Sequence, residues 1–283
     1  MERRTNKEVY KRTNKIAYKG TNKKAYKGTD KKAYKRTVRK IHPDMAPKWG
    51  IYNLALDLIF PGRCPVCDKI IKFRQEYVCA ACLEKIKFVR EPACMKCGKP
   101  LEEETEYCFD CARKKHFYIK GAAVFEYASM ASCIYRFKYG GRQEYAGFLG
   151  RCMAKRLKKE LEDWKPEALI PVPVHTSRRR KRGYNQSELL AEALSRQTGI
   201  PVRKDIVKRV KKTVPQKELD IRQRQNNLKK AFKIIENDVK LNTIVIIDDI
   251  YTTGSTVDAM AAVLQEAGIK NIYYAALAVG RGL

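Results

Sequence analysis

The sequence contains no apolar run that approaches the roughly 20 residues of a membrane span. Its basic first residues are not followed by the apolar core of a secretory signal. It also lacks the G-x-x-x-x-G-K-[ST] motif, which argues against nucleotide binding through a P-loop. These absences predict a soluble, cytoplasmic protein with no transmembrane segment, whose cysteines stay reduced.

Acidic residues are scarce: 31 Asp and Glu face 60 Lys and Arg, and the formal net charge is +29. Residues 1–44 hold 16 Lys and Arg and four Asp and Glu, so +12 lies in this segment and +17 in the remainder. A basic balance that persists outside the first segment points to polyanionic partners such as nucleic acid or phosphorylated metabolites. A solvated basic surface is the alternative interpretation.

Residues 1–44 form a low-complexity basic tail that repeats with a period of eight, from RTNKEVYK to GTDKKAYK. The tail has almost no aliphatic residues to bury, so we expect it to be disordered. Its tyrosines alternate with lysines and could stack on single-stranded bases while the lysines follow the phosphates. We favour a simpler explanation, either a tandem duplication without a function or a translation start at Met45.

Eight of the ten cysteines form four C-x-x-C pairs separated by 11, 11 and 10 residues. Each pair is typical of a zinc knuckle, and two knuckles complete a tetrahedral four-thiolate site with no open position. We therefore predict two structural Zn²⁺ ions in a zinc-ribbon domain over residues 45–118. Such a small segment needs the metal to fold. The eight predicted ligands are Cys64, Cys67, Cys79, Cys82, Cys94, Cys97, Cys108 and Cys111.

Disulfides are the rival interpretation of these cysteines, but they need an oxidising compartment. The short intervals leave open which knuckles share an ion. Cys133 and Cys152 lie outside the pattern and are expected to be small packing residues, and His116 is not expected to be a ligand because the cysteines fill both sites.

The second half of the chain alternates apolar runs of strand length with amphipathic helical patterns. This alternation predicts an α/β domain over residues 119–283, with a parallel sheet covered by helices on both faces. In such sheets, ligands bind at the carboxyl ends of the strands. The expected strands are 168–174, 243–250 and 271–280, and the expected helices are 185–199 and 255–268; a further short helix is expected over 49–60.

The stretch IVIIDDIYTTGST, residues 244–256, lies at such a strand end. Asp248 and Asp249 can accept hydrogen bonds from sugar hydroxyls, and the turn that follows offers hydroxyls, amides and a helix N-terminus to a phosphate monoester. Gly254 lets the backbone approach the phosphate oxygens. We therefore predict a ribose 5-phosphate site, with a charged strand end and a plain loop as the alternative. The turn consists of Thr252, Thr253, Gly254, Ser255 and Thr256.

The motifs together resemble the ComF family of competence proteins over about residues 53–281. The resemblance rests on LALDLIFPGRCPVC, the four knuckles, YRFKYGGRQEYA, PVPVHTSRRRKRGYNQSELLA, TVPQKELDIRQRQNNLKKAF and VIIDDIYTTGST. The last is similar to the phosphoribosyl pyrophosphate (PRPP) motif of type I phosphoribosyltransferases. The resemblance implies a double zinc ribbon followed by a type I phosphoribosyltransferase fold, with PRPP as ligand and Mg²⁺ bound with it.

Carried over to this sequence, the motif implies that Asp248 and Asp249 hold the ribose 2′ and 3′ hydroxyls and that residues 252–256 bind the 5′-phosphate. The implied pyrophosphate loop contains Val174, His175, Thr176 and Ser177, and the cations from Arg178 to Arg182 follow it. The implied flap over the site carries Arg222, Arg224 and Asn227.

Two departures narrow the implied activity. Purine-type relatives usually carry a carboxylate where this chain has Thr252, so a purine acceptor is not expected. The chain also has no N-terminal glutaminase segment, so we do not expect it to liberate ammonia from glutamine. The RRRKRG run (178–183) fits a pyrophosphate clamp, a nucleic-acid patch or a solvated loop, and its place favours the clamp. The sequence assigns no catalytic residue.

Three functions remain in play. The first is DNA uptake in natural transformation, with PRPP, single-stranded DNA and, by resemblance, a competence helicase as partners, in the cytoplasm or at the periphery of the membrane uptake machinery. The second is a metabolic phosphoribosyltransferase that transfers ribose 5-phosphate to an unidentified acceptor. The third is a non-catalytic regulator that senses PRPP. The sequence leaves the acceptor and the oligomeric state open.

Overall fold

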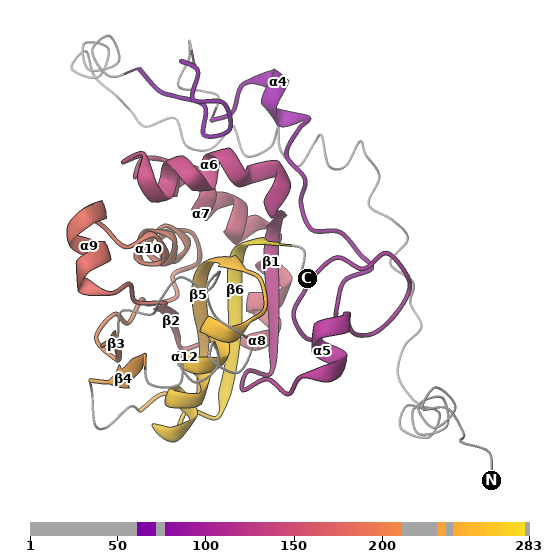
Figure 1. Cartoon of the computed structure of the whole chain (residues 1–283), viewed down its shortest axis with the longest axis vertical. Helices are drawn as coiled ribbons and strands as arrows, with labels where there is room; N and C mark the ends of the chain where they lie inside the picture. Colours follow the sequence, from indigo (N-terminus) through magenta and orange to yellow (C-terminus); the bar gives the residue numbers. More distant parts are fainter. Residues whose placement is uncertain (1–60, 72–76, 211–230, 236–239, 281–283) are drawn as a thin grey trace. The chain divides into compact units, whose positions relative to one another are not determined.

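A computed structural model describes residues 61–71, 77–210, 231–235 and 240–280 (Figure 1). A four-stranded sheet with the order β1-β6-β5-β2 lies at its centre, and each neighbouring pair in this sheet is parallel. The predicted parallel α/β sheet is therefore confirmed. The strands are β1 (Lys120–Glu126), β2 (Ala168–Pro171), β5 (Thr243–Tyr251) and β6 (Asn271–Val279).

Two of the three predicted strands, β5 and β6, match their apolar runs to within a residue. The predicted strand 168–174 is too long, since β2 ends at Pro171. Pro173 has no amide hydrogen with which to extend the ladder. The sequence pattern missed β1, whose inner part combines Gly121 with small and apolar residues and is buried over its length.

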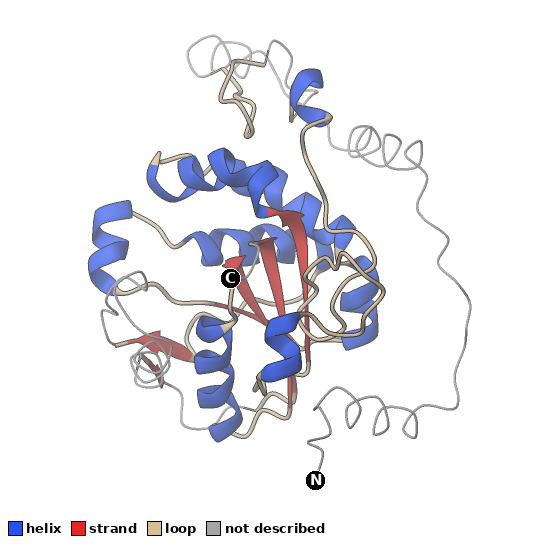
Figure 2. Ribbon diagram, turned by 45° about the vertical axis from the view of Figure 1, so that its right-hand side comes forward, coloured by secondary structure: helices blue, strands red, loops and turns tan. Residues whose placement is uncertain are grey.

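Helices cover both faces of the sheet (Figure 2). The two predicted helices are present as α10 and α12, and Gly199 and Gly268 adopt positive φ just beyond them, as expected of C-terminal glycines. The helices around the sheet are α6 (Tyr127–Tyr139), α7 (Tyr145–Arg156), α8 (Lys158–Trp164), α9 (Thr176–Arg182), α10 (Gln186–Thr198) and α12 (Ser255–Glu266).

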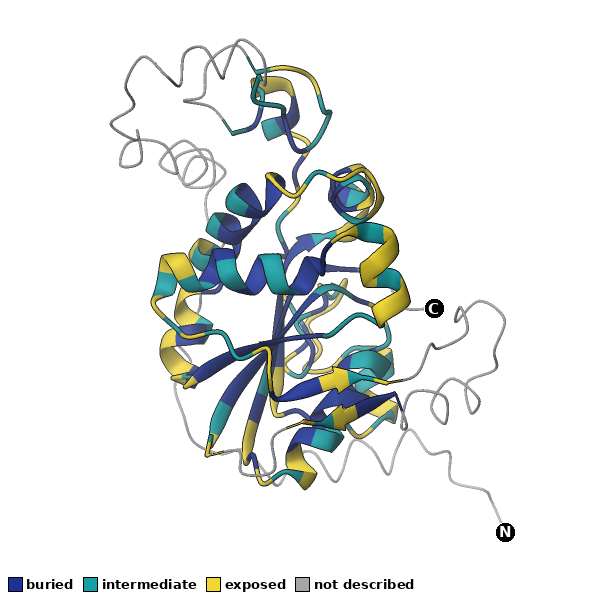
Figure 3. Cartoon of the chain, turned by 90° about the vertical axis from the view of Figure 1, so that its left-hand side faces the viewer, coloured by how far each residue is buried: buried dark blue, intermediate teal, exposed yellow. Residues whose placement is uncertain are grey.

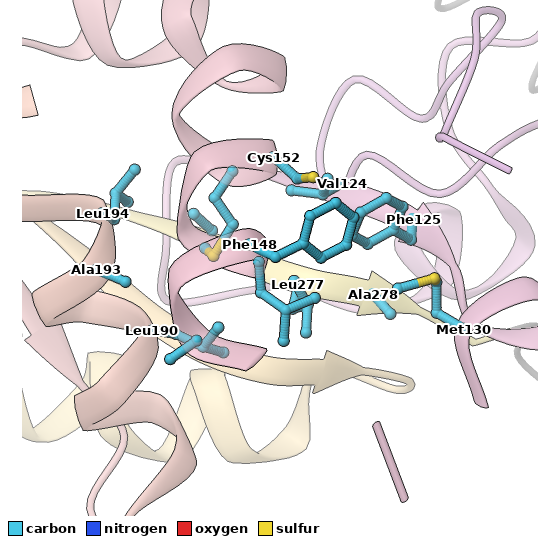
Figure 4. Packing of buried hydrophobic residues seen from close by; sticks show 14 of the residues in the cluster. Val124, Phe125, Met130, Phe148, Cys152, Leu190, Ala193, Leu194, Leu277 and Ala278 are labelled. Carbon is cyan, nitrogen blue, oxygen red and sulfur yellow. The ribbon is translucent and has the colours of Figure 1, made fainter. Parts of the chain in front are cut away.

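One core lies between the sheet and the helices α6, α7, α8 and α10. Phe125 and Leu277 from the strands pack there with Phe148 and Leu190 from the helices (Figure 4). The other core lies beneath α12 and the antiparallel pair β3 (Val207–Arg209) and β4 (Phe232–Ile234). Because both faces are covered, the strands are buried almost throughout (Figure 3), which explains their continuous apolar runs.

The two cysteine-rich segments join different cores. Cys64 and Cys82, with the short helix α4 (Ala80–Leu83), belong to the core of α6 and α7. Cys94 and Cys97 belong to the core of α12, and the short helix α5 (Phe109–Arg113) follows them. All described residues fall within one compact unit. The domain limits at residues 44/45 and 118/119 stay predictions.

Three predicted features lie outside the described residues: the tail over 1–44, the helix over 49–60 and the flap. Within the described part of the chain, no helix is long and apolar enough to cross a membrane.

Candidate functional site

The eight knuckle cysteines form two groups of four in sequence order, so neighbouring knuckles pair. In each group the four sulfur atoms lie within 4.8 Å of one another, and all eight cysteines are free thiols. Four converging thiolates with no open position fit a structural Zn²⁺ site. The first group is Cys64, Cys67, Cys79 and Cys82, and the second is Cys94, Cys97, Cys108 and Cys111. The clusters are consistent with two structural zinc ions.

The first knuckle of each group has the same backbone turn. The amide of Asp68 donates to the carbonyl of Cys64, and the amide of Gly98 donates to that of Cys94, both over 2.8 Å. Asp68 and Gly98 have φ of 62° and 66°, a left-handed conformation that turns the chain back sharply. The two groups are therefore repeats of one local structure.

The second cysteine group is fastened to α12 through the buried carboxylate of Asp258. His116 donates from Nδ1 to this carboxylate over 3.0 Å, while its Nε2 lies 3.4 Å from the sulfur of Cys111. Lys114 forms an ion pair with Asp258, and the amide of Phe117 donates to it over 3.2 Å. His116 lies beside the group of four cysteines. That it is not a ligand stays a prediction.

The first group is fastened to the opposite core. The guanidinium of Arg136, in α6, donates to the carbonyl of Val66 over 2.6 Å. Asp68 accepts hydrogen bonds from Arg142, over 3.1 Å, and from the hydroxyl of Tyr145. Arg142, which flanks the glycines of YRFKYGGRQEYA, thus contacts the first ribbon.

Asp248 and Asp249 lie together near the carboxyl end of β5, as the sequence predicted. Asp248 is buried, and its Oδ1 accepts from the hydroxyl of Ser187 over 3.3 Å and from the amide of Asp249 over 2.9 Å. Asp249 forms an ion pair of 2.9 Å with Lys138, the penultimate residue of α6. Burial raises the pKa of Asp248 to about 7; the charge of Asp249 acts in the same direction, and Lys138 opposes it.

The turn that follows β5 opens α12, with Gly254 as its N-cap at φ 74°. The hydroxyls of Thr253 and Ser255 lie 3.0 Å apart. A Cβ atom on Gly254 would come within 2.5 Å of the Tyr251 hydroxyl, so this position requires glycine both for its conformation and for space. The turn therefore presents hydroxyls and the N-terminus of a 12-residue helix, an arrangement suited to an anion.

Three buried tyrosines form a packed cluster next to this turn. Tyr251 stacks on Tyr274 with ring centroids 4.6 Å apart, and its hydroxyl lies 2.7 Å from that of Tyr118. The hydroxyl of Tyr274 donates to the carbonyl of Cys97 over 2.5 Å. The turn, the sheet and the second ribbon thus share one packed cluster.

The predicted pyrophosphate loop is partly helical. Val174 and His175 lie in the loop after β2, whereas Thr176 and Ser177 already belong to α9. His175 is the N-cap: its Nδ1 accepts from the amide of Ser177 over 3.2 Å. The run from Arg178 to Arg182 forms the rest of α9.

The cations of this edge extend to β3. Burial lowers the pKa of Arg209, the positive charge of Arg178 acts in the same direction, and the carboxylate of Asp248 opposes both. Arg209 and Arg178 therefore lie within electrostatic reach of one another, and Arg209 also of Asp248. The described structure thus places the strand-end carboxylates beside Ser187 and Lys138, and the pKa of Arg209 responds to the charge of Asp248. The predicted flap residues Arg222, Arg224 and Asn227 lie outside the described structure.

Sequence reasoning missed Ser187, Arg209 and Asp258. These residues come from a helix or strand where nothing in the local pattern marks them. The sequence gives a partial signal only for Ser187, because this residue directly follows the RGYNQ segment, whose last residue begins α10. Lys138 lies in FKYGGRQ (137–143), a segment whose glycines and flanking cations fit a phosphate contact and a plain turn equally well.

Comparison with known families agrees with this architecture. The family described as "Double zinc ribbon domain" matches residues 55–112, and the family described as "Phosphoribosyl transferase domain" matches residues 184–282. The protein therefore has a phosphoribosyltransferase fold preceded by a double zinc ribbon.

Several proteins are similar over most of the chain. "Competence protein F" of Haemophilus influenzae is 33% identical over 223 residues, which cover 75% of this chain and 95% of that protein. "DNA utilization protein YhgH" of Shigella flexneri is 30% identical over 219 residues, 76% of this chain and 96% of that protein. "Competence protein ComFC" of Bacillus subtilis is 30% identical over 202 residues, 69% and 80%. The chain belongs to the ComF family.

Proposed function

We propose that this protein binds PRPP at the carboxyl end of β5 and binds single-stranded DNA, and that it acts in DNA uptake. One observation carries the PRPP assignment: two adjacent carboxylates, Asp248 and Asp249, stand beside a hydroxyl-rich turn that opens a helix. Carboxylates that can accept hydrogen bonds from two neighbouring hydroxyls, next to a turn that can bind a phosphate monoester, suit a ribose 5-phosphate.

Each part of the ligand has a group of matching chemistry nearby. The carboxylates accept hydrogen bonds from the ribose hydroxyls, and residues 252–256 receive the 5′-phosphate. The diphosphate faces the segment from Val174 to Arg182, whose cations offset its charge. Mg²⁺ would accompany PRPP, because diphosphate oxygens are the hard ligands that this ion prefers.

The DNA-binding part of the function has different support. The formal net charge of +17 outside residues 1–44 favours a polyanionic partner. The names of the relatives refer to competence and to DNA utilization, and the match to this chain covers most of the length of each relative. A competence helicase is the protein partner that this assignment implies, and the site of action is the cytoplasmic side of the uptake machinery.

The alternatives use the same PRPP site. A metabolic phosphoribosyltransferase would release pyrophosphate in the presence of an acceptor, and a PRPP-sensing regulator would bind PRPP without turnover. Thr252, in the place where purine-type enzymes usually have a carboxylate, leaves no group there to handle the ring proton of a purine.

A calorimetric titration of the full chain with PRPP and Mg²⁺, with and without an oligothymidylate, tests both ligands. We expect saturable PRPP binding, and DNA binding that weakens as salt rises. Absence of PRPP binding would remove the site assignment. Binding of PRPP without any DNA binding would instead favour the enzyme or the regulator, and pyrophosphate release with candidate acceptors would then separate those two.

A further inference from the structure

A pair of exposed tyrosines on α6 lies beside the arginine-rich helix α9. Tyr135 and Tyr139 are 64% and 60% exposed, although large aromatic side chains are usually buried. They are four residues apart, on one face of the helix, and their ring centroids lie 5.2 Å from each other. The guanidinium of Arg182 lies 4.7 Å from the ring centroid of Tyr139. We call Tyr135, Tyr139, Arg180, Lys181 and Arg182 the tyrosine–arginine face.

This face has an unbalanced charge. α9 has the sequence TSRRRKR, and neither α9 nor α6 contains an Asp or Glu residue. Arg180 and Lys181 are exposed. Arg179 has a partner in Glu188, at 3.1 Å. The local field therefore attracts an anion along the exposed side of α9.

Buried contacts hold the two helices in place relative to each other. The carbonyl of Phe137 accepts from the hydroxyl of Tyr184 over 2.5 Å, and that of Lys138 accepts from the side chain of Gln186 over 3.3 Å. Both donors follow α9 directly in the chain. The end of α6 that carries Tyr139 is thus anchored to Tyr184, which lies between α9 and α10, and to Gln186, the first residue of α10.

Exposed aromatic rings beside an arginine whose helix carries further exposed cations match the chemistry of single-stranded DNA. Its bases offer flat faces for stacking without sequence preference, and its phosphates pair with Arg and Lys. A duplex keeps its bases stacked inside, so it could use the cations but not the rings. We propose that the tyrosine–arginine face is the surface on which single-stranded DNA binds. This inference rests on the proposed function and names the surface of the protein at which the proposed DNA binding takes place.

The face adjoins the proposed PRPP site. Two consecutive residues of α6 contact both sites: Lys138 pairs with Asp249 of the proposed PRPP site, and Tyr139 contacts Arg182 of the tyrosine–arginine face. A single-stranded DNA bound to this face would therefore pass close to the part of the proposed PRPP site that faces the diphosphate.

The test uses the full chain and a fluorescein-labelled oligothymidylate, with binding followed by anisotropy over a range of salt concentrations. Removal of both rings in Tyr135→Ala/Tyr139→Ala should weaken binding by about 5- to 150-fold for each stacked base. The log–log salt slope should stay unchanged because the cations that neutralise phosphates are all retained. Tyr135→Phe/Tyr139→Phe keeps the rings and should retain the affinity.

Two further variants check the geometry. Arg180→Gln/Lys181→Gln should make the salt slope shallower by about 0.7 for each phosphate that the variant no longer neutralises. Phe109→Ala is the matched control: Phe109 is 62% exposed and its ring centroid lies 3.7 Å from the guanidinium of Arg113, but it belongs to the second ribbon. It should bind DNA as the wild type does. PRPP calorimetry on the tyrosine and Phe109 variants checks that the sheet domain is intact. Thermal unfolding makes the same check for Arg180→Gln/Lys181→Gln, whose side chains belong to the segment proposed to face the diphosphate.

The outcomes separate the inference from the proposed function. If the wild type binds DNA and the double alanine variant binds it equally well, DNA binds elsewhere, residues 1–44 included, and the inference is overturned while the function stands. A changed oligomeric state with unchanged DNA affinity would identify the face as a protein contact and would also overturn it. If the wild type binds no DNA, the proposed function itself fails.

Discussion

The ammonium of Lys138 lies 2.9 Å from the carboxylate of Asp249 and joins the end of α6 to the carboxyl end of β5. Both side chains are largely buried, at 18% and 13% exposure. One of two adjacent carboxylates is thus neutralised within the protein, while Asp248 keeps a pKa raised by burial. The ammonium therefore offsets the charge of one carboxylate at the end of β5.

Replacement of both carboxylates should weaken PRPP binding and leave the fold intact. Asp248→Asn/Asp249→Asn removes charge-assisted hydrogen bonds to two hydroxyls, each of about 1.5–3 kcal/mol. This corresponds to about 10- to 150-fold in affinity per hydrogen bond. Calorimetry measures it, with Asp205→Asn, which removes an exposed pair with Arg203, as the control. Unchanged affinity would mean that the motif is only a strand end.

The stability of the protein should depend on the ionisation of Asp248. Its folded-state pKa of about 7 lies above the ordinary value of 3.8, so between about pH 4 and 7 the folded protein holds a proton that the unfolded chain releases. Rising pH over this window therefore lowers the free energy of unfolding, by up to about 4 kcal/mol above pH 7. Asp248→Asn has no such cost.

Urea unfolding of the wild type and Asp248→Asn at a series of pH values tests this. The variant should gain stability relative to the wild type as pH rises, since other titrating groups cancel in the comparison. Lys138→Gln removes the charge that opposes the shift and should move the transition to higher pH. Parallel pH profiles of the wild type and Asp248→Asn would contradict the prediction.

The link between the second ribbon and α12 should be measurable as stability. Asp258→Asn removes the ion pair with Lys114 and weakens the hydrogen bond from His116, and we expect a decrease of about 1.5–3 kcal/mol in the free energy of unfolding because the side chain is buried. Urea unfolding measures the decrease. Asp205→Asn, at an exposed pair, should change stability by less than about 1 kcal/mol. Metal analysis should find two zinc ions per chain in both variants; a value near one would contradict the two-site assignment.

Gly254 should tolerate no side chain. Gly254→Ala places a Cβ 2.5 Å from the Tyr251 hydroxyl and forces a left-handed conformation, which alone costs about 1–2 kcal/mol. We expect a loss of stability beyond that cost, with weakened PRPP binding. Gly199→Ala is the control, because Gly199 has a φ of 75° but open space around it. Equal decreases in thermal stability would show that the contact with Tyr251 is unimportant.

DNA binding should be strongly dependent on salt. Each phosphate neutralised on a single strand contributes a log–log slope of about −0.7, so a footprint of about four to six phosphates gives roughly −3 to −4. Deletion of residues 1–44 should reduce affinity modestly and make the slope shallower. Loss of nearly all binding would instead identify the tyrosine–lysine repeat as the DNA-binding element.

Much of the architecture could be read from local patterns. The strands β5 and β6 and the helices α10 and α12 follow from apolar runs and periodicity, because burial on both faces leaves a clear record in the sequence. β1 was not predicted, because the small residues around Gly121 have little β-propensity. The structure requires a small residue at position 121, since a larger side chain there would collide with Tyr274. The pairing of the knuckles needed three-dimensional distances.

The residues of the site also fall into those that a local motif shows and those that it does not. Asp248, Asp249 and the turn that follows are contiguous, so their chemistry is visible in one motif. Lys138 reaches the site from α6, which is remote in sequence, and Asp258 contacts Lys114 and His116, which are equally remote from it. The polar side chains of Lys138 and Asp258 look like ordinary helix-surface residues. Only the packing of those helices against the sheet shows that they face inward.

The attachment of the ribbons to different cores has a consequence for biosynthesis. The first ribbon meets its partner Arg136 after 70 residues, whereas His116 must wait 142 residues for Asp258. At a translation rate of about 5–20 residues per second, these intervals are about 4–14 and 7–28 seconds. The metal-binding segments thus emerge from the ribosome well before the surfaces that cover them. The contact of the first ribbon with Arg136 can therefore form before β2, β5 and β6 are synthesised, whereas the contact of His116 with Asp258 can form only after α12 has been synthesised.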